Sequence, residues 1–335
     1  MGVKQGGPLS PKLFSIYIDE LANDICNLEN GCEIRDINTS IILYADDTAL
    51  LFETKRDLQR AMDKLQEYCL NHEIRINVNK TKYFTTSKLD SGDKIKIGSI
   101  ELESVGKFKY LGWWLEKNLS NKEHLKARKF AALVASYQIN NIGFKSKQMD
   151  TSVKITLRDT YCRSRMNFAL ENTFLCQKDY ADLNTIECKI LKSAVGLRKY
   201  HSNTLMNNAL GITPIETMLK IRKLNFINEL MGYELTSDII EQQMSNNQRI
   251  PPKSFIREIL NLTDKANLKI EEVQKTTQCM IRDMKEKVKK DQNSKTSLAL
   301  KYLLEKKSKA ASELARNLFV WSNNPKYTKS TPEAG

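Results

Sequence analysis

The sequence predicts an α+β protein in which short strands and two helices come first and an all-helical region follows. Short apolar, β-prone runs separated by turn residues recur between residues 41 and 115. From residue 121 onward, apolar residues recur at intervals of three and four, the spacing of amphipathic helices. With 335 residues and 41% hydrophobic content, the chain is long enough for about two or three packed domains.

A glycine-rich loop leads into the first predicted helix. Gly6 and Gly7 lack a Cβ, so another backbone, a base or a sugar can approach them closely. Ser10 is placed to cap the helix, with Pro11 at its first position. No Lys-Ser or Lys-Thr pair closes the loop, which argues against a phosphate-binding P-loop. The apolar stripe of the helix is expected to contain Leu13, Ile16, Tyr17, Leu21 and Ile25.

Two adjacent carboxylates, Asp46 and Asp47, lie between the apolar runs 41–43 and 49–52. This pattern predicts a hairpin with both aspartates at or beside its turn. Adjacent ionised carboxylates repel each other, so a bound divalent cation would stabilise them. Mg²⁺ suits such a pair, since it needs only one or two carboxylates and takes its other oxygens from water and substrate phosphates. The competing interpretation is a turn that merely happens to carry aspartate.

The remaining elements of the first part are a helix and several short strands. The helix is expected over residues 55–71 and the strands over residues 75–78, 83–86, 94–97, 99–102 and 108–115. The last strand is expected to be interrupted or bent at Gly112. Trp113 and Trp114 are adjacent and would face opposite sides of this strand, one in the core and one able to stack on nucleic acid.

The second part of the sequence is helical and basic. Helices are expected over residues 121–140, 151–176 and 180–195, with Gly196 ending the third, and from Thr213 onward. The first of these has an apolar stripe of Leu125, Phe130, Leu133, Val134 and Tyr137. Residues 245–252 read as a linker, 285–290 and 297–321 as further helix, and 327–335 as a tail.

The net charge of +13 and the pI near 9.2 indicate an acidic partner. Nucleic acid is the simplest candidate, although a merely soluble basic protein would have the same charge. Residues 251–335 contain 18 Lys and Arg against 10 Asp and Glu, so much of the excess is C-terminal. Further basic residues that could contact phosphate lie on the helix of residues 121–140 and in the loop containing Arg198, Lys199 and His201.

The cysteines and histidines do not form a metal-binding pattern. Seven cysteines and three histidines are scattered without zinc-site spacing, and the odd cysteine count favours reduced thiols. No apolar stretch approaches the roughly 20 residues of a spanning helix, and no signal peptide is visible. We therefore expect an intracellular protein of the nucleus or cytoplasm that is not secreted and has no membrane partner.

Four segments in order resemble the reverse transcriptases of non-LTR (LINE-type) retrotransposons. They are GVKQGGPLSPKLFSIYIDEL at residues 2–21, ILYADDTALLF at 42–52, IRINVNKTK at 74–82 and FKYLGWWL at 108–115. The resemblance covers roughly the first 115 residues and is specific there. The rest of the chain resembles the family only in being helical and basic.

The resemblance implies a role for each matching residue. Asp46 would be the direct metal ligand with Asp47 in support, Ala45 would lie beneath the primer end, and Tyr44 would shape that site. Lys80 would approach the triphosphate and could protonate the departing pyrophosphate. The residues beside the template base and incoming nucleotide would be Gln5, Gly6, Gly7 and Pro8. The primer grip would be Tyr110, Leu111, Gly112 and Trp113.

The implied chemistry is two-metal nucleotidyl transfer onto a DNA primer, with Mg²⁺ or Mn²⁺ as cofactor. The implied partners are an RNA template, a DNA primer or RNA–DNA hybrid, and dNTPs. The family also uses a palm aspartate on a strand that precedes the glutamine-glycine loop. Because Gly2 already lies in this loop, we expect that strand and the fingers on an upstream segment of the parent polypeptide. The other aspartates, Asp57, Asp63 and Asp90, are expected to be surface residues.

The sequence thus predicts a truncated right-hand polymerase. A partial palm would cover residues 1–118, a helical thumb or connection 119–244, and a basic helical C-terminal extension 245–335. The parent would be an RNA-directed DNA polymerase, and this chain alone is expected to be inactive. Two alternatives stay open: a group II intron maturase-like reverse transcriptase, and a non-catalytic nucleic-acid-binding remnant.

Overall fold

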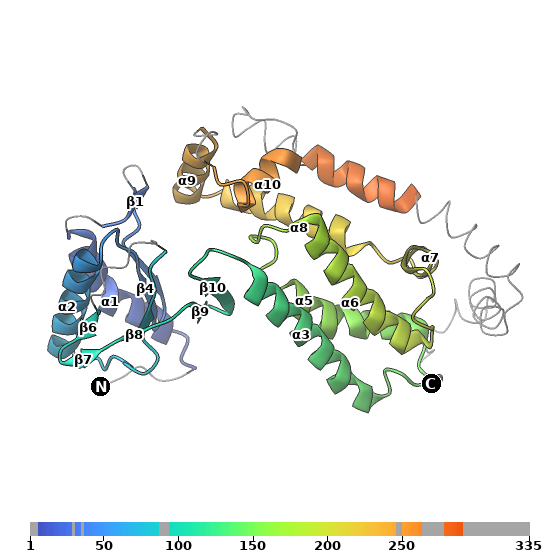
Figure 1. The fold of residues 1–335 in the computed structure, drawn as a ribbon, viewed down its shortest axis with the longest axis horizontal. Coiled ribbons are helices and arrows are strands. Elements are labelled where there is room, and N and C mark those ends of the chain that lie inside the picture. Colours follow the sequence, from blue (N-terminus) through green and yellow to red (C-terminus); the bar gives the residue numbers. More distant parts are fainter. Residues whose placement is uncertain are drawn as a thin grey trace, which may run out of the picture. The chain divides into compact units, whose positions relative to one another are not determined.

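The computed structural model describes residues 6–28, 31–34, 37–86, 94–245, 250–262 and 278–290. The chain divides into two compact units, each of which is built from two stretches of sequence (Figure 1). Unit 1 consists of Met1–Ala127 with Glu234–Asn246, and unit 2 consists of Arg128–Tyr233 with Asn247–Gly335. All strands of the described residues lie in unit 1, and the described part of unit 2 is helical, as the α+β prediction requires.

Unit 1 combines helices with pairs of short strands. Its helices are α1 (Ser10–Cys26), α2 (Lys55–Asn71), α9 (Glu234–Ser245) and the first part of α3 (Lys122–Ile139). Its strands are β1 (Glu33–Ile34), β2 (Ile37–Asn38), β3 (Ile41–Tyr44), β4 (Asp47–Leu50), β5 (Lys82–Tyr83), β6 (Lys96–Ile97), β7 (Ile100–Glu101), β8 (Glu103–Ser104), β9 (Lys107–Tyr110) and β10 (Trp113–Glu116). The pairs β1–β2, β3–β4, β6–β7 and β9–β10 are antiparallel, and β5–β8 is parallel.

Two neighbouring hydrophobic clusters form the core of unit 1. In the first, the buried face of α1 packs against α2 and against the β3–β4 hairpin; its buried members are Ile18, Leu21, Ile25, Ala61 and Tyr68. The buried members of the second are Met62, Ile95, Ile97 and Leu102. Leu50 of β4 and Leu65 of α2 contact both clusters. The base of the β3–β4 hairpin is therefore held by the whole core of the unit.

Two details of α1 differ from the sequence prediction. Ser10 does not cap the helix: its N–H donates to the Gly7 carbonyl, which draws Ser10 into the first turn and leaves Leu9 at the N-cap. The predicted apolar stripe is right for Leu21 and Ile25. It is wrong for Leu13, Ile16 and Tyr17, which are 54%, 65% and 46% exposed, because the helix turns the face of Ile18, Leu21 and Ile25 towards α2.

The strand predictions also need correction. Residues 74–77 are irregular and 78–80 form a turn, because the Asn77 carbonyl accepts hydrogen bonds from the N–H groups of Lys80 and Thr81 instead of joining a ladder. The segment 108–115 is interrupted at Leu111 and Gly112, which confirms the predicted interruption, and its two halves, β9 and β10, pair as a hairpin. The other predicted strands are present in shortened form as β5, β6 and β7.

Unit 2 is a set of packed helices. They are the second part of α3, a 3₁₀ turn η1 (Asn140–Ile142), α4 (Thr151–Leu157), a π-helical segment η2 (Arg158–Arg163), α5 (Ser164–Asn167), α6 (Gln177–Val195), α7 (Asn203–Ala209), α8 (Ile215–Leu230) and α10 (Phe255–Leu262). Residues 278–290 are also helical, which agrees with the charge-dense helix expected at 285–290. The expected helix 297–321 and tail 327–335 lie outside the described residues.

Two of the predicted boundaries in unit 2 are confirmed and one is wrong. Gly196 ends α6 in the left-handed conformation, with φ of 75°, and α8 begins directly after Pro214. The helix expected to reach residue 176 ends at Asn167, because Phe168 leaves helical geometry with ψ of 122° and Ala169 follows with φ of 57°. On α3, Ala132 and Ala135 fill the buried face, whereas Phe130 and Tyr137, expected in the apolar stripe, are 67% and 69% exposed.

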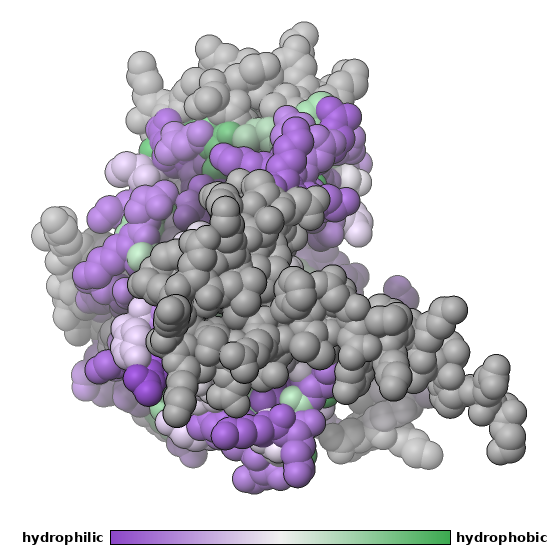
Figure 2. Space-filling model, turned by 90° about the vertical axis from the view of Figure 1, so that its right-hand side faces the viewer, coloured by the Kyte–Doolittle hydropathy of each residue, from purple (hydrophilic) through white to green (hydrophobic). Residues whose placement is uncertain are grey.

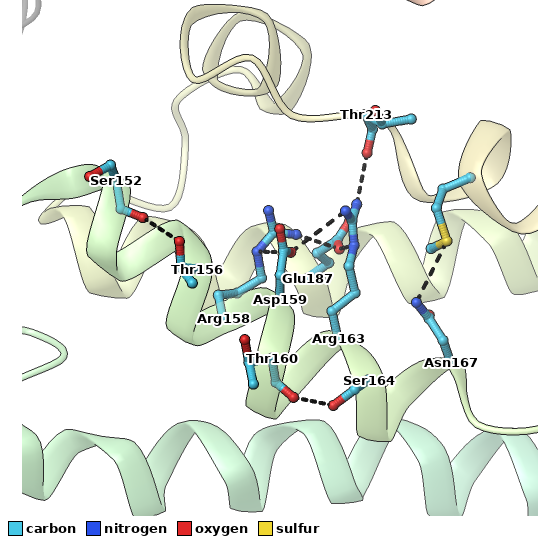
Figure 3. A network of polar contacts seen from close by, with 11 residues as sticks. Ser152, Thr156, Arg158, Asp159, Thr160, Arg163, Ser164, Asn167, Glu187 and Thr213 are labelled. Carbon is cyan, nitrogen blue, oxygen red and sulfur yellow. Dashed lines mark hydrogen bonds and ion pairs between the residues drawn. The ribbon is translucent and has the colours of Figure 1, made fainter. Parts of the chain in front are cut away.

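A buried ion-pair network joins three parts of unit 2 (Figure 3). Arg158 and Arg163, both in the π-helical segment, donate to the same carboxylate oxygen of Glu187 on α6, the Arg158 bond measuring 2.6 Å. Arg163 also donates to the Thr213 carbonyl before α8, at 2.7 Å. Burial lowers the pKa of Arg158, and the charge of Glu187 opposes this effect. The network fixes the π-helical segment against α6 and the start of α8.

A second buried cluster makes α10 part of the core of unit 2. The Glu258 carboxylate accepts hydrogen bonds from Lys223 at 2.8 Å, Tyr180 at 2.8 Å and the Leu175 N–H at 3.1 Å. Lys223 and Glu258 are 0% and 8% exposed. The sequence placed α10 in a separate C-terminal extension; in the structure these contacts attach it to α6 and α8, so the helix belongs to unit 2.

The surface agrees with the high charge of the chain. On the face drawn in Figure 2, the coloured residues are mostly hydrophilic, with only small hydrophobic areas between them. None of the helices in the described part of the chain is both long enough and apolar enough to span a membrane.

Candidate functional site

The two aspartates singled out in the sequence lie at the tip of the β3–β4 hairpin. The strands pair in the register Leu43 with Thr48 and Tyr44 with Asp47, so Ala45 and Asp46 form the two-residue turn. Asp46 and Asp47 are both exposed, and Tyr44 is 64% exposed. The predicted hairpin, with its carboxylates at and beside the turn, is therefore confirmed.

The turn itself adopts a conformation that is unusual for its sequence. Ala45 has φ of 53°, whereas Asp46 is not among the described residues with positive φ. Positive φ at the first central residue alone is the sign pattern of a type II′ turn, which matches the twist of a hairpin but normally has glycine there. A left-handed conformation at a non-glycine residue costs about 1–2 kcal/mol. The packed strands maintain this strained turn, in which Asp46 is exposed to solvent.

A second hairpin, β9–β10, lies close to the first. It has Tyr110 paired with Trp113 and the turn at Leu111 and Gly112, whose φ angles are 46° and 84°. The Tyr110 hydroxyl is buried and has no hydrogen-bond partner among the described residues. Burial raises the pKa of Tyr110, and the negative charge of Asp47 raises it further. Asp47 and Tyr110 therefore lie within range of an electrostatic interaction, although residues 47–110 separate the two turns.

The two tryptophans of β10 contact different partners, as expected for adjacent strand residues. The Trp113 ring meets the ring of buried His124 edge-on, with centroids 6.0 Å apart. The ammonium group of Lys107 lies 5.6 Å from the centroid of the Trp114 ring. Stacking of Trp114 on nucleic acid remains a prediction.

The glycine-rich loop is described only from Gly6 onward, so Gln5 lies outside the described residues. Gly6 has φ of 80°, and an added Cβ there would meet nothing within 4 Å. Its backbone conformation, rather than crowding inside the protein, therefore favours glycine. Gly7 is half-buried and Pro8 is exposed, and both lead directly into α1.

Lys80 is exposed at the end of the turn formed by residues 78–80. Its neighbour Val78 packs on the same cluster as Leu50 at the base of the aspartate hairpin. The turn of Lys80 and the aspartate hairpin are therefore attached to one core. Among the described residues no ion pair joins Lys80 to Asp46 or Asp47, and the role of Lys80 stays a prediction.

The donors at the hairpin tip fit part of a site for a hard divalent cation. Asp46 and Asp47 provide adjacent carboxylate oxygens in an open position, which leaves room for water and phosphate oxygens as the remaining ligands. Within the described ranges there is no group of three or more His, Cys, Asp or Glu side chains that could hold a metal ion. Two adjacent carboxylates fit an ion that takes most of its ligands from water and substrate.

Two structural residues of this region escaped the sequence reasoning. Gly31 bridges to Phe52 beside the aspartate hairpin, and a Cβ on Gly31 would lie 1.9 Å from Ser40 Oγ. A glycine next to a strand is the signal that could have identified it. Asp57, expected on the surface, is 6% exposed and forms a capping pair with Thr54 at the start of α2. Thr54 and Asp57 have the capping-box spacing, which would have predicted this role. Asp63 is exposed as expected, and Asp90 lies outside the described residues.

Comparison with known proteins gives a family match for the first part of the chain. Residues 1–115 match the sequence model of the family described as "Reverse transcriptase (RNA-dependent DNA polymerase)". This family has the palm-type polymerase fold and uses divalent metal ions. The matched residues all lie in unit 1.

Three curated proteins with similar sequences come from mobile elements. The chain is 32% identical over 136 residues to "Probable RNA-directed DNA polymerase from transposon BS" of Drosophila melanogaster, a match that covers 38% of this chain and 14% of the relative. It is 22% identical over 207 residues to "RNA-directed DNA polymerase from mobile element jockey" of Drosophila funebris, a match that covers 59% of this chain and 22% of the relative. It is 31% identical over 123 residues to "Retrovirus-related Pol polyprotein from type-2 retrotransposable element R2DM" of Drosophila melanogaster, a match that covers 33% of this chain and 11% of the relative.

Residues 1–115 are thus similar to the reverse transcriptase family, and the three relatives carry names of polymerases or polyproteins of mobile elements. The matched region spans between 11% and 22% of the length of these three relatives.

Proposed function

We propose that this chain is part of an RNA-directed DNA polymerase that extends a DNA primer on an RNA template with dNTPs. Two observations support the proposal. Four family-like segments occur in order within residues 1–115, and the hairpin carrying Asp46 and Asp47 lies next to the Tyr110 hairpin. The second observation carries more weight, because the fold joins two segments that the sequence alone leaves far apart.

In the proposed site, Asp46 binds a divalent ion directly and Asp47 supports it, with Mg²⁺ or Mn²⁺ as the ion. When bound, such ions activate the primer 3′-hydroxyl and stabilise charge on the transferred phosphate. The hairpin turn at Leu111 and Gly112 positions the primer terminus beside Asp47. Gly6, Gly7 and Pro8, with Gln5, border the template base and the incoming nucleotide. Lys80 donates a proton to the pyrophosphate as it leaves.

The helical region provides the contacts with the RNA–DNA hybrid in this proposal. On α3 an exposed face presents Lys126, Phe130 and Tyr137, while Ala132 and Ala135 face inward. A face of this kind can follow a phosphate backbone through its charge. We propose that residues 1–118 act as a partial palm, 119–244 as thumb or connection, and 245–335 as a basic extension whose helix α10 packs against α6 and α8.

The same proposal assigns part of the catalytic site to another segment. Residues 1–115 supply Asp46 and Asp47, and by family resemblance a further aspartate comes from a strand preceding the glutamine-glycine loop. We propose that a fingers and palm segment of the parent polypeptide supplies it, and that the 335-residue chain alone does not polymerise. The proposed location of the parent is the nucleus or cytoplasm.

The test of the metal role uses the parent protein with its upstream reading frame restored. Asp46→Ala should lower dNTP incorporation on a primed RNA template by at least about 100-fold, since metal coordination contributes several kcal/mol to phosphoryl transfer. Hybrid binding should change little. Asp63→Ala, which alters an exposed aspartate of α2 in the same unit, is the matched control and should retain full activity. Synthesis by the Asp46→Ala protein would refute the assigned role.

Binding by the 335-residue chain tests the helical region separately. Its affinity for an RNA–DNA hybrid should fall steeply and linearly in a log–log plot against salt, because each neutralised phosphate releases counterions. Salt-insensitive binding, or no binding at low salt, would contradict the proposed backbone contacts. Salt-sensitive binding without polymerisation by the parent would favour the non-catalytic remnant. Stimulation of intron RNA splicing by the parent would favour the maturase-like alternative.

A further inference from the structure

The loop between α6 and α7 presents a group of exposed basic and aromatic side chains. Arg198 and Lys199 are exposed, and Tyr200 is 69% exposed. The Tyr200 ring stacks on the half-buried ring of His201, with centroids 5.1 Å apart and planes 14° apart. Arg198 donates from Nη1 to the Tyr200 hydroxyl at 2.8 Å, and its guanidinium carbon lies 6.0 Å from the centre of the ring. Tyr200 is therefore supported by a second ring and a cation.

The backbone of this loop is fixed from below by a buried cation. Lys192 is 7% exposed, and its ammonium group donates to the carbonyls of Lys199, at 3.0 Å, and of His201. The Leu197 N–H donates to the Lys192 carbonyl, which closes the end of α6. Burying a lysine is unfavourable unless its donors are satisfied, so this contact is a specific structural feature of the loop. It holds the exposed side chains in one arrangement before any ligand binds.

The charge of this region is also one-sided. Residues 188–215 contain Lys189, Lys192, Arg198 and Lys199 but no Asp or Glu. Elsewhere in unit 2 several cations are paired with carboxylates, among them Arg158, Arg163, Lys220, Arg222 and Lys223. Arg198 and Lys199 form no such pair within the described ranges, so their charges are directed to solvent. The loop thus combines unneutralised positive charge with a fixed aromatic ring.

We propose that this loop, residues 197–202, binds unpaired nucleotides of a single-stranded nucleic acid. A base would stack on the face of Tyr200 that is turned away from His201, and the flanking phosphates would contact Arg198 and Lys199. Stacking requires an unpaired base, since paired bases in a duplex already stack on each other, whereas charge alone would bind any polyanion. The site lies outside residues 1–115 and does not require that the chain polymerises.

The test measures binding of a labelled single strand of about 12 nucleotides, close to the site size of known single-strand binders, to the 335-residue chain. Tyr200→Ala should weaken binding at least about fivefold, the lower end of the effect of removing one stacking ring. Because Lys192 binds main-chain carbonyls of the loop, Tyr200→Ala leaves these hydrogen bonds in place. Tyr233→Ala, at an equally exposed tyrosine that precedes Glu234, is the matched control and should change nothing.

The charge contribution is tested in parallel. Lys199→Glu should weaken single-strand binding, and Lys178→Glu, at an exposed lysine of α6 beside Asp179, should do so much less. Photo-crosslinking with a thiouridine-containing strand should label the peptide with residues 198–201. RNA and DNA strands of the same sequence are compared to identify which single strand is bound. Equal affinity of the wild-type and Tyr200→Ala proteins, or a loss only in Lys199→Glu, would overturn the stacking site.

The same variants distinguish this inference from the proposed function. Tyr200→Ala should leave RNA–DNA hybrid binding unchanged, because a duplex offers no free base. If the hybrid fails to bind the wild-type chain while the single strand still does so through Tyr200, the proposed thumb contacts fail and the loop site stands. If the hybrid binds and Tyr200→Ala has no effect on the single strand, only the loop site fails.

Discussion

The carboxylate of Glu258 is the most informative position for testing how unit 2 is held together. It is 8% exposed and neutralises Lys223, which is completely buried. It also accepts hydrogen bonds from the Tyr180 hydroxyl and the Leu175 N–H. Replacing Glu258 with alanine leaves the ammonium group of Lys223 in the core, where the Thr173 carbonyl is its remaining hydrogen-bond acceptor among the described residues. We therefore expect Glu258→Ala to weaken unit 2 strongly.

The expected loss of unfolding free energy depends on how deeply the ion pair is buried, and not on the distance between its charged atoms. Removing one partner of a buried ion pair costs about 3–5 kcal/mol, because the remaining charge stays desolvated. A pair of nearly equal length provides the control. Lys220 and Glu216 lie 2.7 Å apart in the same unit, but their side chains are 24% and 39% exposed. Glu216→Ala should cost only about 0.2–1 kcal/mol, the usual range for a surface pair.

The assay must report on unit 2 alone, because a chain with two units need not unfold in one step. Native-state hydrogen exchange, read by mass spectrometry in peptides from α6 and α8, meets this requirement. Protection there should fall far more in Glu258→Ala than in Glu216→Ala. The double variant Lys223→Met with Glu258→Leu should recover most of the loss, since it removes both buried charges. Equal effects of the two single variants would refute the argument from burial.

Two further predictions concern pH and the aspartate hairpin. Burial lowers the pKa of the Lys223 ammonium group below 10.5, and the charge of Glu258 opposes this shift. The unfolded chain therefore binds the lysine proton more tightly than the folded chain does. The free energy of unfolding should rise with pH between the folded and the unfolded pKa of Lys223. Glu258→Ala removes the charge that opposes the shift and so lowers the folded pKa further. Part of its defect should therefore disappear as the pH rises towards 10.5, in urea unfolding followed by circular dichroism, and a defect that grows with pH would contradict this assignment. In Gly31→Ala, the new Cβ would meet Ser40 Oγ at 1.9 Å, and we expect a cost of about 1–3 kcal/mol, seen as faster hydrogen exchange in residues 41–52. Adding Ser40→Ala should recover part of this loss, and wild-type exchange in Gly31→Ala alone would refute the close contact.

The sequence predicted the elements whose signals are local. The Asp46–Asp47 hairpin follows from two β-prone runs around polar residues, and the end of α6 follows from Gly196 in a left-handed position. The reverse transcriptase family was likewise readable, because its motifs are short and occur in a fixed order. These features depend on neighbours within a few residues, which a sequence displays directly.

The prediction of buried residues failed on helices where apolar residues with helical spacing occur on more than one face. On α1 the residues Leu13, Ile16 and Tyr17 have helical spacing, yet the buried face is the one with Ile18. On α3 the large side chains Phe130 and Tyr137 are exposed and two alanines are buried. Periodicity shows that a helix has an apolar face, but only its packing partner determines which of several apolar residues are covered.

The sequence alone therefore determined the family of the first third of the chain, the aspartate turn and the basic character of the whole. Only the tertiary structure placed Tyr110 near Asp47, drew α10 into unit 2 through Glu258 and fixed the Tyr200 loop above Lys192. The physical reason is the range of the interactions. Turns and caps are set by adjacent residues, whereas the effect of a buried charge or a neighbouring carboxylate depends on groups that only folding brings within a few ångströms.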